Sequence, residues 1–203
     1  ETHAGVQYAL NLFAGLIVFT GFSDIVNRAP GLISQQPNLV KKVVFPLHLI
    51  AWSAVLSATF QALISVMIIF LGVVFFTGHL PLGLLLLPFI FLMFLPMLLG
   101  IAWGLSALGV YLPDTQHLAS IITAPLMFLS PIFYPISMLP DWAQQWILLN
   151  PLTLVIESVR AALLGSPWPS LTYLIIYTGA SVVMGLLGAA LFHKLRKGFA
   201  DVL

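Results

Sequence analysis

Five apolar stretches constrain the fold of this chain more than any other feature of its sequence. They cover residues 8–26, 47–76, 82–111, 118–133 and 171–192. A helix needs about 20 mainly apolar residues to cross the hydrocarbon core of a bilayer. Charged residues make up only 6% of the 203 residues and the mean hydropathy is +1.10, whereas soluble domains carry about 25% charged residues. We therefore predict an all-α integral membrane protein, in which residues 1–203 form one transmembrane domain.

The basic residues predict how these five spans are oriented. Lys and Arg accumulate in the cytoplasmic segments of membrane proteins. If the C-terminus faces the cytoplasm, all but one of the seven basic residues fall on that side: Arg28, Lys41, Lys42, Lys194, Arg196 and Lys197. Only Arg160 then lies outside. The sequence therefore predicts a multi-pass protein whose C-terminus is cytoplasmic.

Prolines divide the apolar segment that follows the fourth span into short pieces. They stand at positions 131, 135, 140, 151, 167 and 169. Each proline removes a backbone donor and prevents a helix from continuing through it. In hydrocarbon, broken backbone is tolerated only where protein or a water-filled cavity shields it. Residues 134–169 are therefore interpreted either as a re-entrant pair of short helices beside a substrate path or as an amphipathic segment on the external membrane surface.

The first internal loop, residues 27–46, is the most polar part of the chain. Its polar side chains alternate with apolar ones, a pattern that suits one or two short helices on the inner surface. One interpretation is a docking element for a cytoplasmic partner. The other is a solvated connector whose lysines follow the positive-inside rule.

Three groups of ionisable residues are candidates for function or for local pairing. Glu157 and Arg160 are three residues apart on one helical face and can pair with each other. Asp24 lies near the inner end of the first span, where a carboxylate either marks a functional site or reaches water. Asp114 follows Pro113 and opens the fourth span, a position that suits helix capping.

Catalytic and metal-binding motifs are weak in this sequence. Ser181 stands among small residues and loosely resembles an intramembrane protease serine, but such serines more often form helix-packing surfaces. No His/Glu pair has metal-ligand spacing, no phosphate-binding loop is present, and the chain contains no cysteine. We expect no catalytic residue, metal or cofactor on this chain, so any ATP would be hydrolysed by a separate protein. An intramembrane lipid-modifying enzyme, with Ser181, His193 or Glu157 as catalyst, is the alternative.

Four motifs occur in an order and spacing that point to a known family. They are residues 39–46 (LVKKVVFP), residues 111–114 (YLPD), residues 131–135 (PIFYP), and residues 150–153 (NPLT) followed by Glu157 and Arg160. Together they resemble the coupling junction, the Tyr/Phe-x-Arg-Asp element and the external signature of type-2 ABC export permeases, although Pro113 stands where arginine is usual. The resemblance covers about residues 15–197 and is greatest to subunits that export O-antigen, capsule or teichoic-acid chains on a lipid carrier.

The resemblance implies an assembly in the bacterial plasma (inner) membrane. Such permeases have six spans with an amphipathic helix before the first, so the first span would be missing from this chain. Two permeases pair as a homodimer, and each docks a cytoplasmic ATPase that binds ATP and Mg. The implied function is export of a lipid-linked glycan; a type-2 ABC exporter of a drug or small lipid is the alternative.

The resemblance also assigns residues to two sites. The residues that would couple to the ATPase are Gln35, Pro37, Asn38, Leu39, Lys41, Lys42, Pro113 and Asp114. The residues that would form the external gate and pathway are Phe133, Tyr134, Asn150, Pro151, Glu157 and Arg160.

Overall fold

The computed structural model of the protein describes residues 2–38, 46–78 and 81–202, and every regular element in them is a helix. The long helices are α1 (Thr2–Arg28), α4 (His48–Thr77), α5 (Leu87–Tyr111) and α9 (Leu171–Leu195). Shorter α-helices are α2 (Gly31–Ser34), α6 (Thr115–Leu129), α7 (Asp141–Ile147), α8 (Thr153–Leu164) and α10 (Phe199–Val202). Three 3₁₀ turns complete the fold: η1 (Leu82–Leu86), η2 (Ile136–Met138) and η3 (Arg196–Gly198).

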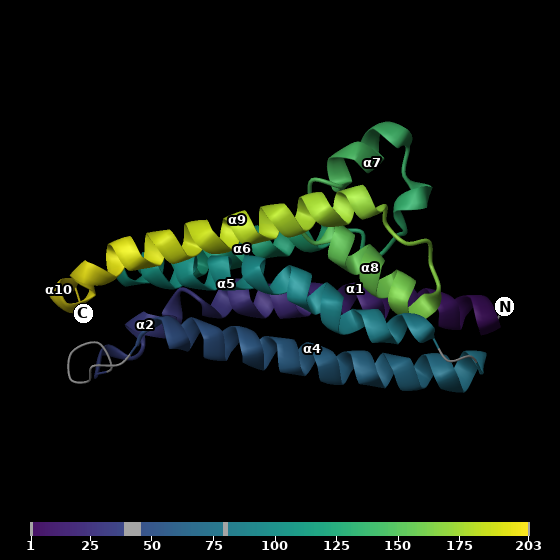
Figure 1. Ribbon diagram of the computed structural model, residues 1–203, viewed down its shortest axis with the longest axis horizontal. Helices are drawn as coiled ribbons and strands as arrows, with labels where there is room; N and C mark the ends of the chain where they lie inside the picture. The colour runs from purple at the N-terminus through teal and green to yellow at the C-terminus, as the bar shows by residue number, and fades with distance from the viewer. Residues whose placement is uncertain (1, 39–45, 79–80, 203) are drawn as a thin grey trace.

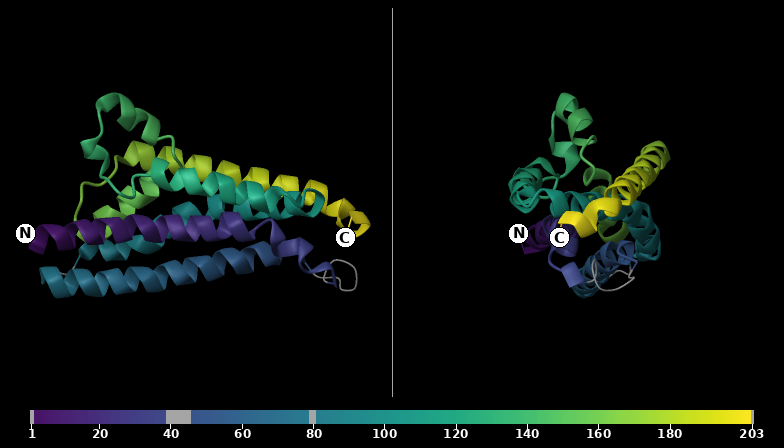
Figure 2. Two further views of the ribbon diagram at one scale, coloured as in Figure 1. Left: turned by 180° about the vertical axis from the view of Figure 1, so that it is seen from behind. Right: turned by 90° about the vertical axis from the view of Figure 1, so that its left-hand side faces the viewer.

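The long helices lie side by side along the longest axis of the molecule (Figure 1). The N-terminus lies at one end and the C-terminus at the other, and α7 projects from the bundle near the N-terminal end (Figure 2). We call the end that carries α7 and α8 the outer end, and the end that carries α2 and α10 the inner end, after the predicted orientation. The two sites implied by the resemblance therefore lie at opposite ends of one bundle.

The predicted spans agree with the observed helices except at the fourth. Within the described residues, four helices are long and apolar enough to cross a membrane: 5–28, 48–76, 82–111 and 171–198. The fourth predicted span, residues 118–133, corresponds to the shorter helix α6 (Thr115–Leu129), which begins three residues earlier and ends four residues earlier. It ends at Leu129 because Pro131 disfavours helical backbone at Ser130, whose φ of −90° and ψ of 147° are extended.

The helices α5 and α9 pack closely because small residues line their contact. A Cβ atom added at Gly188 would overlap the backbone carbonyl of Gly100. Beside this contact, the Ser181 hydroxyl donates to the Met93 carbonyl at 2.8 Å and accepts from the Met97 amide at 3.0 Å. These two groups of α5 flank Pro96, which interrupts the helical hydrogen bonding. The contacts of Ser181 therefore agree with its interpretation as a packing residue.

Candidate functional site

The helix α8 is buried at the outer end of the bundle. Ten of its twelve residues are buried, and it packs against α1, η1 and α5. A helix of this length spans about 18 Å, which is too short to cross a hydrocarbon core of about 30 Å. Its burial among longer helices therefore fits the re-entrant interpretation for this part of the external segment.

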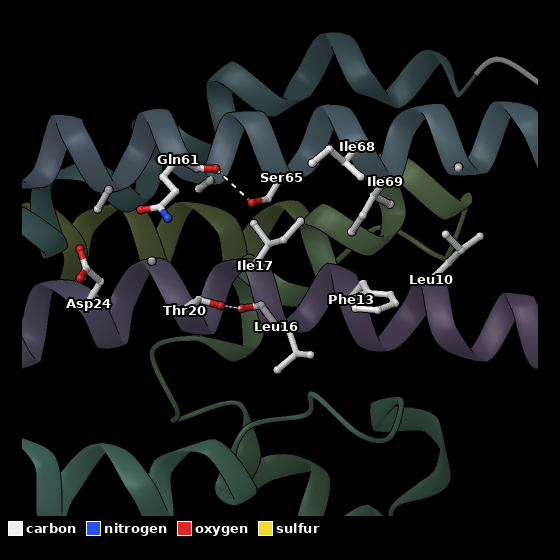
Figure 3. A pocket seen from close by; sticks show the side chains of 14 residues that line it. Leu10, Phe13, Leu16, Ile17, Thr20, Asp24, Gln61, Ser65, Ile68 and Ile69 are labelled. Carbon is white, nitrogen blue, oxygen red and sulfur yellow. Dashed lines mark hydrogen bonds between the residues drawn. The ribbon is translucent and has the colours of Figure 1, made fainter.

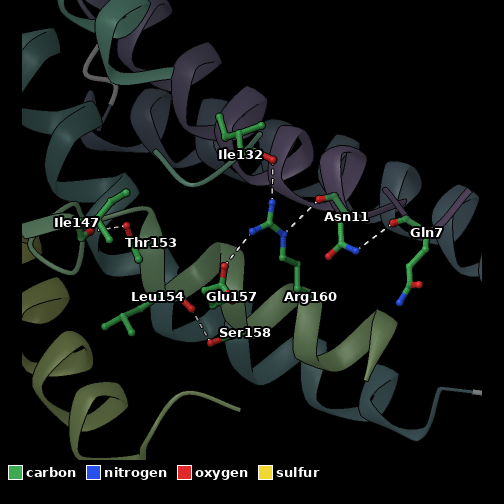
Figure 4. A network of polar contacts seen from close by, with 9 residues as sticks. All are labelled: Gln7, Asn11, Ile132, Ile147, Thr153, Leu154, Glu157, Ser158 and Arg160. Atoms are coloured by element: carbon green, nitrogen blue, oxygen red, sulfur yellow. Dashed lines mark hydrogen bonds and ion pairs between the residues drawn. The ribbon is translucent and has the colours of Figure 1, made fainter. Parts of the chain in front are cut away.

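Arg160 of α8 connects three segments of the chain, as Figure 4 shows. Its guanidinium forms an ion pair with Glu157 at 2.8 Å, donates to the Ile132 carbonyl at 2.8 Å, and donates to the Asn11 carbonyl of α1 at 3.2 Å. The Arg160 side chain is 2% exposed and that of Glu157 is 17% exposed. The predicted pair is present, and it lies deeper than the sequence suggested. A charge at this depth requires such partners, since an unpaired buried charge is costly.

Gly15 of α1 makes room for this network. A Cβ atom added there would lie 3.1 Å from the Ile132 Cα and 3.3 Å from the Arg160 Nη2. Ile132 itself is fully buried against α1. Sequence reasoning missed Gly15, although a glycine inside an apolar helix can indicate a close backbone approach.

Asn150 and Thr153 fix the junction between α7 and α8. The Asn150 side chain donates to the Ser130 hydroxyl at 2.9 Å and to the Leu129 carbonyl at 3.2 Å, and it accepts from the Leu152 amide at 2.9 Å. The Thr153 hydroxyl donates to the Ile147 carbonyl at the end of α7 at 2.6 Å. The predicted gate residue Asn150 is thus joined to the end of α6, while its neighbour Pro151 is exposed.

Aromatic side chains gather between α6 and α7. Phe128 and Phe133 stack with their ring centres 5.9 Å apart, and the Tyr134 hydroxyl donates to the Phe128 carbonyl at 3.4 Å. A cavity of about 500 Å³ follows this cluster, with Tyr134, Trp142, Trp146 and Asn150 in its wall. Of the predicted gate residues, Tyr134 therefore lines the cavity beside α7. Phe133 stacks on Phe128 of α6 and packs against the core, next to the Ile132 carbonyl that binds Arg160.

A second cavity lies between α1 and α4 (Figure 3). It has a volume of about 480 Å³ and is lined mainly by apolar residues. Its polar residues include Thr20, Asp24, Gln61 and Ser65. Asp24 forms an ion pair with Arg28 at 2.9 Å, and its side chain is 33% exposed. Sequence reasoning missed Gln61 because its apolar neighbours on α4 gave no local signal.

The predicted coupling residues lie at the inner end where the structure describes them. Gln35, Pro37 and Asn38 follow α2 and are exposed; Leu39, Lys41 and Lys42 lie outside the described residues. Pro113 and Asp114 are also exposed, in the turn between α5 and α6. Asp114 occupies the N-cap position of α6 but accepts no capping hydrogen bond. Its carboxylate is therefore accessible from solvent.

The described residues contain no group of three or more His, Cys, Asp or Glu side chains that could hold a metal ion. His193, the nearest candidate partner for Ser181 in sequence, is exposed near the inner end of α9. The Ser181 hydroxyl meanwhile binds two backbone groups of α5. Neither of these two described partners is a base that could activate the hydroxyl as a nucleophile.

Comparison with known proteins gives a consistent result. Residues 1–164 match the family described as ABC-2 type transporter. An O-antigen export system permease protein, RfbA of Myxococcus xanthus, is 27% identical over 194 residues, which cover 94% of this chain and 74% of that protein. The putative transport permease ycf38 of Cyanophora paradoxa is 30% identical over 209 residues, and the match covers 94% of this chain and 72% of that protein. A polysialic acid transport protein, KpsM of Escherichia coli, is 28% identical over 192 residues, and the match covers 92% of this chain and 74% of that protein.

Proposed function

Because the chain belongs to the ABC-2 type transporter family, we propose that it is the membrane-spanning subunit of an ATP-driven exporter of lipid-linked polysaccharide. Relatives named for O-antigen export and for polysialic acid transport support this class of cargo. In this proposal two copies of the chain pair in the inner membrane with their C-termini in the cytoplasm. Each copy docks one ATP-binding subunit, which binds ATP and Mg.

The observation that carries the proposal is the buried helix α8 held by Arg160. A short helix inside the outer end of a bundle can close a path without crossing the membrane. Arg160 ties this helix to α1 and to the segment after α6 through backbone carbonyls. Those bonds can be exchanged for others if the helices shift, because packed interfaces move between discrete arrangements. In the proposal α8 is the external gate, and the bonds from Arg160 to the Asn11 and Ile132 carbonyls keep it closed.

The inner end supplies the docking surface in this proposal. Gln35, Pro37 and Asn38 are exposed beyond α2, and Pro113 and Asp114 are exposed at the same end. The lysines 41 and 42 follow directly along the chain and are proposed to add positive charge to this surface. The proposal favours the docking interpretation over a simple solvated connector, because family members work with a separate ATPase.

Two other functions compete with glycan export. Export of a drug or small lipid would use the same gate and the same docking surface, but the names of the relatives favour a glycan. An intramembrane enzyme would need a free nucleophile, whereas the Ser181 hydroxyl is engaged by Met93 and Met97. Glycan export is therefore the better-supported function.

The proposal is tested by reconstituting the full-length permease with its ATPase in lipid vesicles that carry a lipid-linked glycan. We expect ATP-dependent transfer of the glycan across the membrane, and loss of transfer when the ATPase is made inactive. The pair of substitutions Lys41→Glu and Lys42→Glu is expected to weaken ATPase binding. Transfer that continued without an active ATPase would contradict the proposed mechanism, and transfer of a drug but no glycan would contradict the proposed cargo.

A further inference from the structure

The span formed by η1 and α5 contacts both candidate sites through glycine. At its inner end, a Cβ atom added at Gly109 would overlap the carbonyl of Pro30, the residue before α2. At its outer end, a Cβ atom added at Gly83 would lie 2.5 Å from the Ala162 carbonyl oxygen of α8 and 2.6 Å from the Ala162 Cα. Each contact joins backbone to backbone and leaves no space for a side chain.

Buried side chains reinforce both ends of this span. At the inner end, Ile33 of α2 is 1% exposed and belongs to the same cluster as Ala107 and Val110 of α5. At the outer end, Ala162 of α8 shares a core cluster with Leu87 of α5, and they are 1% and 3% exposed. Protein interiors are close-packed and compress little. A displacement of α2 therefore displaces the inner end of α5, unless the contact breaks.

Pro96 would be the weak point of such a span, but α9 braces it. The Ser181 hydroxyl links the carbonyl of Met93 to the amide of Met97 across the proline turn. A Cβ atom added at Gly185 would lie 2.9 Å from the Pro96 carbonyl oxygen, so α9 also contacts α5 at the proline itself. The contact between Gly100 and Gly188 continues this seam toward the inner end. The two helices can thus move as one body.

We propose that α5, braced by α9, is a strut that carries displacement of α2 at the inner end to α8 at the outer end. Gly83, Gly109 and Ser181 are its positioning residues. This inference rests on the proposed function, because it takes the region after α2 as the docking surface and α8 as the gate. Gly83 and Gly109 are 26 residues apart, which corresponds to about 40 Å along a helix. The strut therefore links sites that share no direct contact.

The first experiment measures export per ATP hydrolysed in the complex of the full chain with its ATPase. Gly109→Ala and Gly83→Ala are each expected to keep ATP hydrolysis and to lower this ratio about 2- to 30-fold, the range in which substitutions along a coupling network act. Ser181→Ala is expected to lower this ratio less. It removes the hydrogen bonds to Met93 and Met97 around Pro96 but adds no atom that would push two backbones apart. The matched controls are Gly179→Ala, where a Cβ atom meets nothing within 4 Å, and Ser120→Ala, whose hydroxyl binds only its own helix.

The second experiment needs neither cargo nor nucleotide. Because the chain has no cysteine, spin labels can be placed at Phe75→Cys on α4 and Ser166→Cys just after α8. Gly109→Ala is expected to shift the distance between the labels, although residue 109 lies at the other end of the bundle. Gly179→Ala is expected to leave that distance unchanged.

The two readouts separate the strut from the proposed function. A complex that exports nothing, while Gly109→Ala still shifts the distance between the labels, would overturn the proposed function and keep the strut. A folded Gly109→Ala chain with an unchanged distance and an unchanged export ratio would overturn the strut. If Gly83→Ala and Gly109→Ala both fail to fold, Ser181→Ala provides the test. An export per ATP hydrolysed equal to that of Ser120→Ala would overturn the bracing of α5 by α9.

Discussion

The helices α7 and α8 come from the same proline-broken segment, yet they lie in different surroundings. α8 is enclosed by α1, η1 and α5, and most of its residues are buried. α7 projects from the bundle (Figure 2), and its Trp142 and Trp146 side chains are each 71% exposed. Thus α8 has the burial that the re-entrant interpretation requires, and α7 has the exposure that the surface interpretation requires; both interpretations stay predictions.

The difference between them shows that apolar character alone does not set how deep a helix lies. α8 carries small residues, Ser158, Ala161 and Ala162, which allow backbones to approach closely. It also carries an arginine whose guanidinium binds Asn11, Glu157 and Ile132 within the protein. α7 instead carries two large aromatic side chains of the kind that is enriched at membrane–water interfaces. Close packing and the three partners of Arg160 hold α8 inside the bundle, whereas the large aromatic side chains of α7 are exposed.

Replacing Arg160 of α8 is expected to lower the free energy of unfolding more than any other substitution proposed for α7 or α8. Arg160→Met leaves the Glu157 carboxylate without its partner and removes the donors to the Asn11 and Ile132 carbonyls. Breaking a buried ion pair costs about 3–5 kcal/mol, so the free energy of unfolding in detergent should fall by about that amount. The matched control is Gln145→Met on the exposed α7, where we expect a change within about 0.5 kcal/mol. Equal effects of the two substitutions would show that α8 is no better anchored than α7.

Removing the Asn150 side chain, which fixes the junction between α7 and α8, is expected to have an intermediate effect on stability. Asn150→Ala removes three hydrogen bonds, to Ser130, Leu129 and Leu152, and leaves part-buried groups unsatisfied. Such losses cost about 1–3 kcal/mol, and we expect a faster proteolytic cut between α7 and α8. Gln144→Ala, which removes one bond to the Leu139 carbonyl, is the control and should cost about 0.5–1.5 kcal/mol. If cleavage were equally fast in both variants, Asn150 would not be what holds the junction.

Local sequence patterns predicted the features that depend on neighbouring residues. Hydropathy located the long helices to within a few residues, apart from the start of α1, and the spacing of Glu157 and Arg160 predicted their ion pair. The polar loop after α1 was expected to form short helices, and α2 is one of them. The end of α6 was predicted four residues too late, because the apolar stretch continues past Leu129 while Pro131 stops the helix.

Contacts between distant residues could not be predicted in this way. The Arg160 donors reach Asn11, which is 149 residues away, and Ile132, which is 28 residues away. Nothing in the spacing of a single sequence marks which backbone carbonyl an arginine will meet. The same holds for Gly83, Gly109 and Ser181, whose importance depends on the backbone that faces each of them. The sequence indicated a packing role for Ser181 but not its partner, and it singled out neither Gly83 nor Gly109.

Changing the exposed tryptophans of α7 is expected to have the smallest effect on stability. The same substitutions test whether α7 contacts lipid. Trp142→Phe with Trp146→Phe should change the free energy of unfolding by less than about 0.5 kcal/mol, because both side chains are exposed. If α7 lies at the membrane surface, tryptophan fluorescence of the original chain should be quenched by brominated lipids, and the double variant should lose part of that quenching. Trp103→Phe is the control, since Trp103 packs edge-on against Trp52 inside the bundle. Quenching that is unchanged in the double variant would mean that these tryptophans do not contact lipid, and it would contradict a position of α7 at the membrane surface.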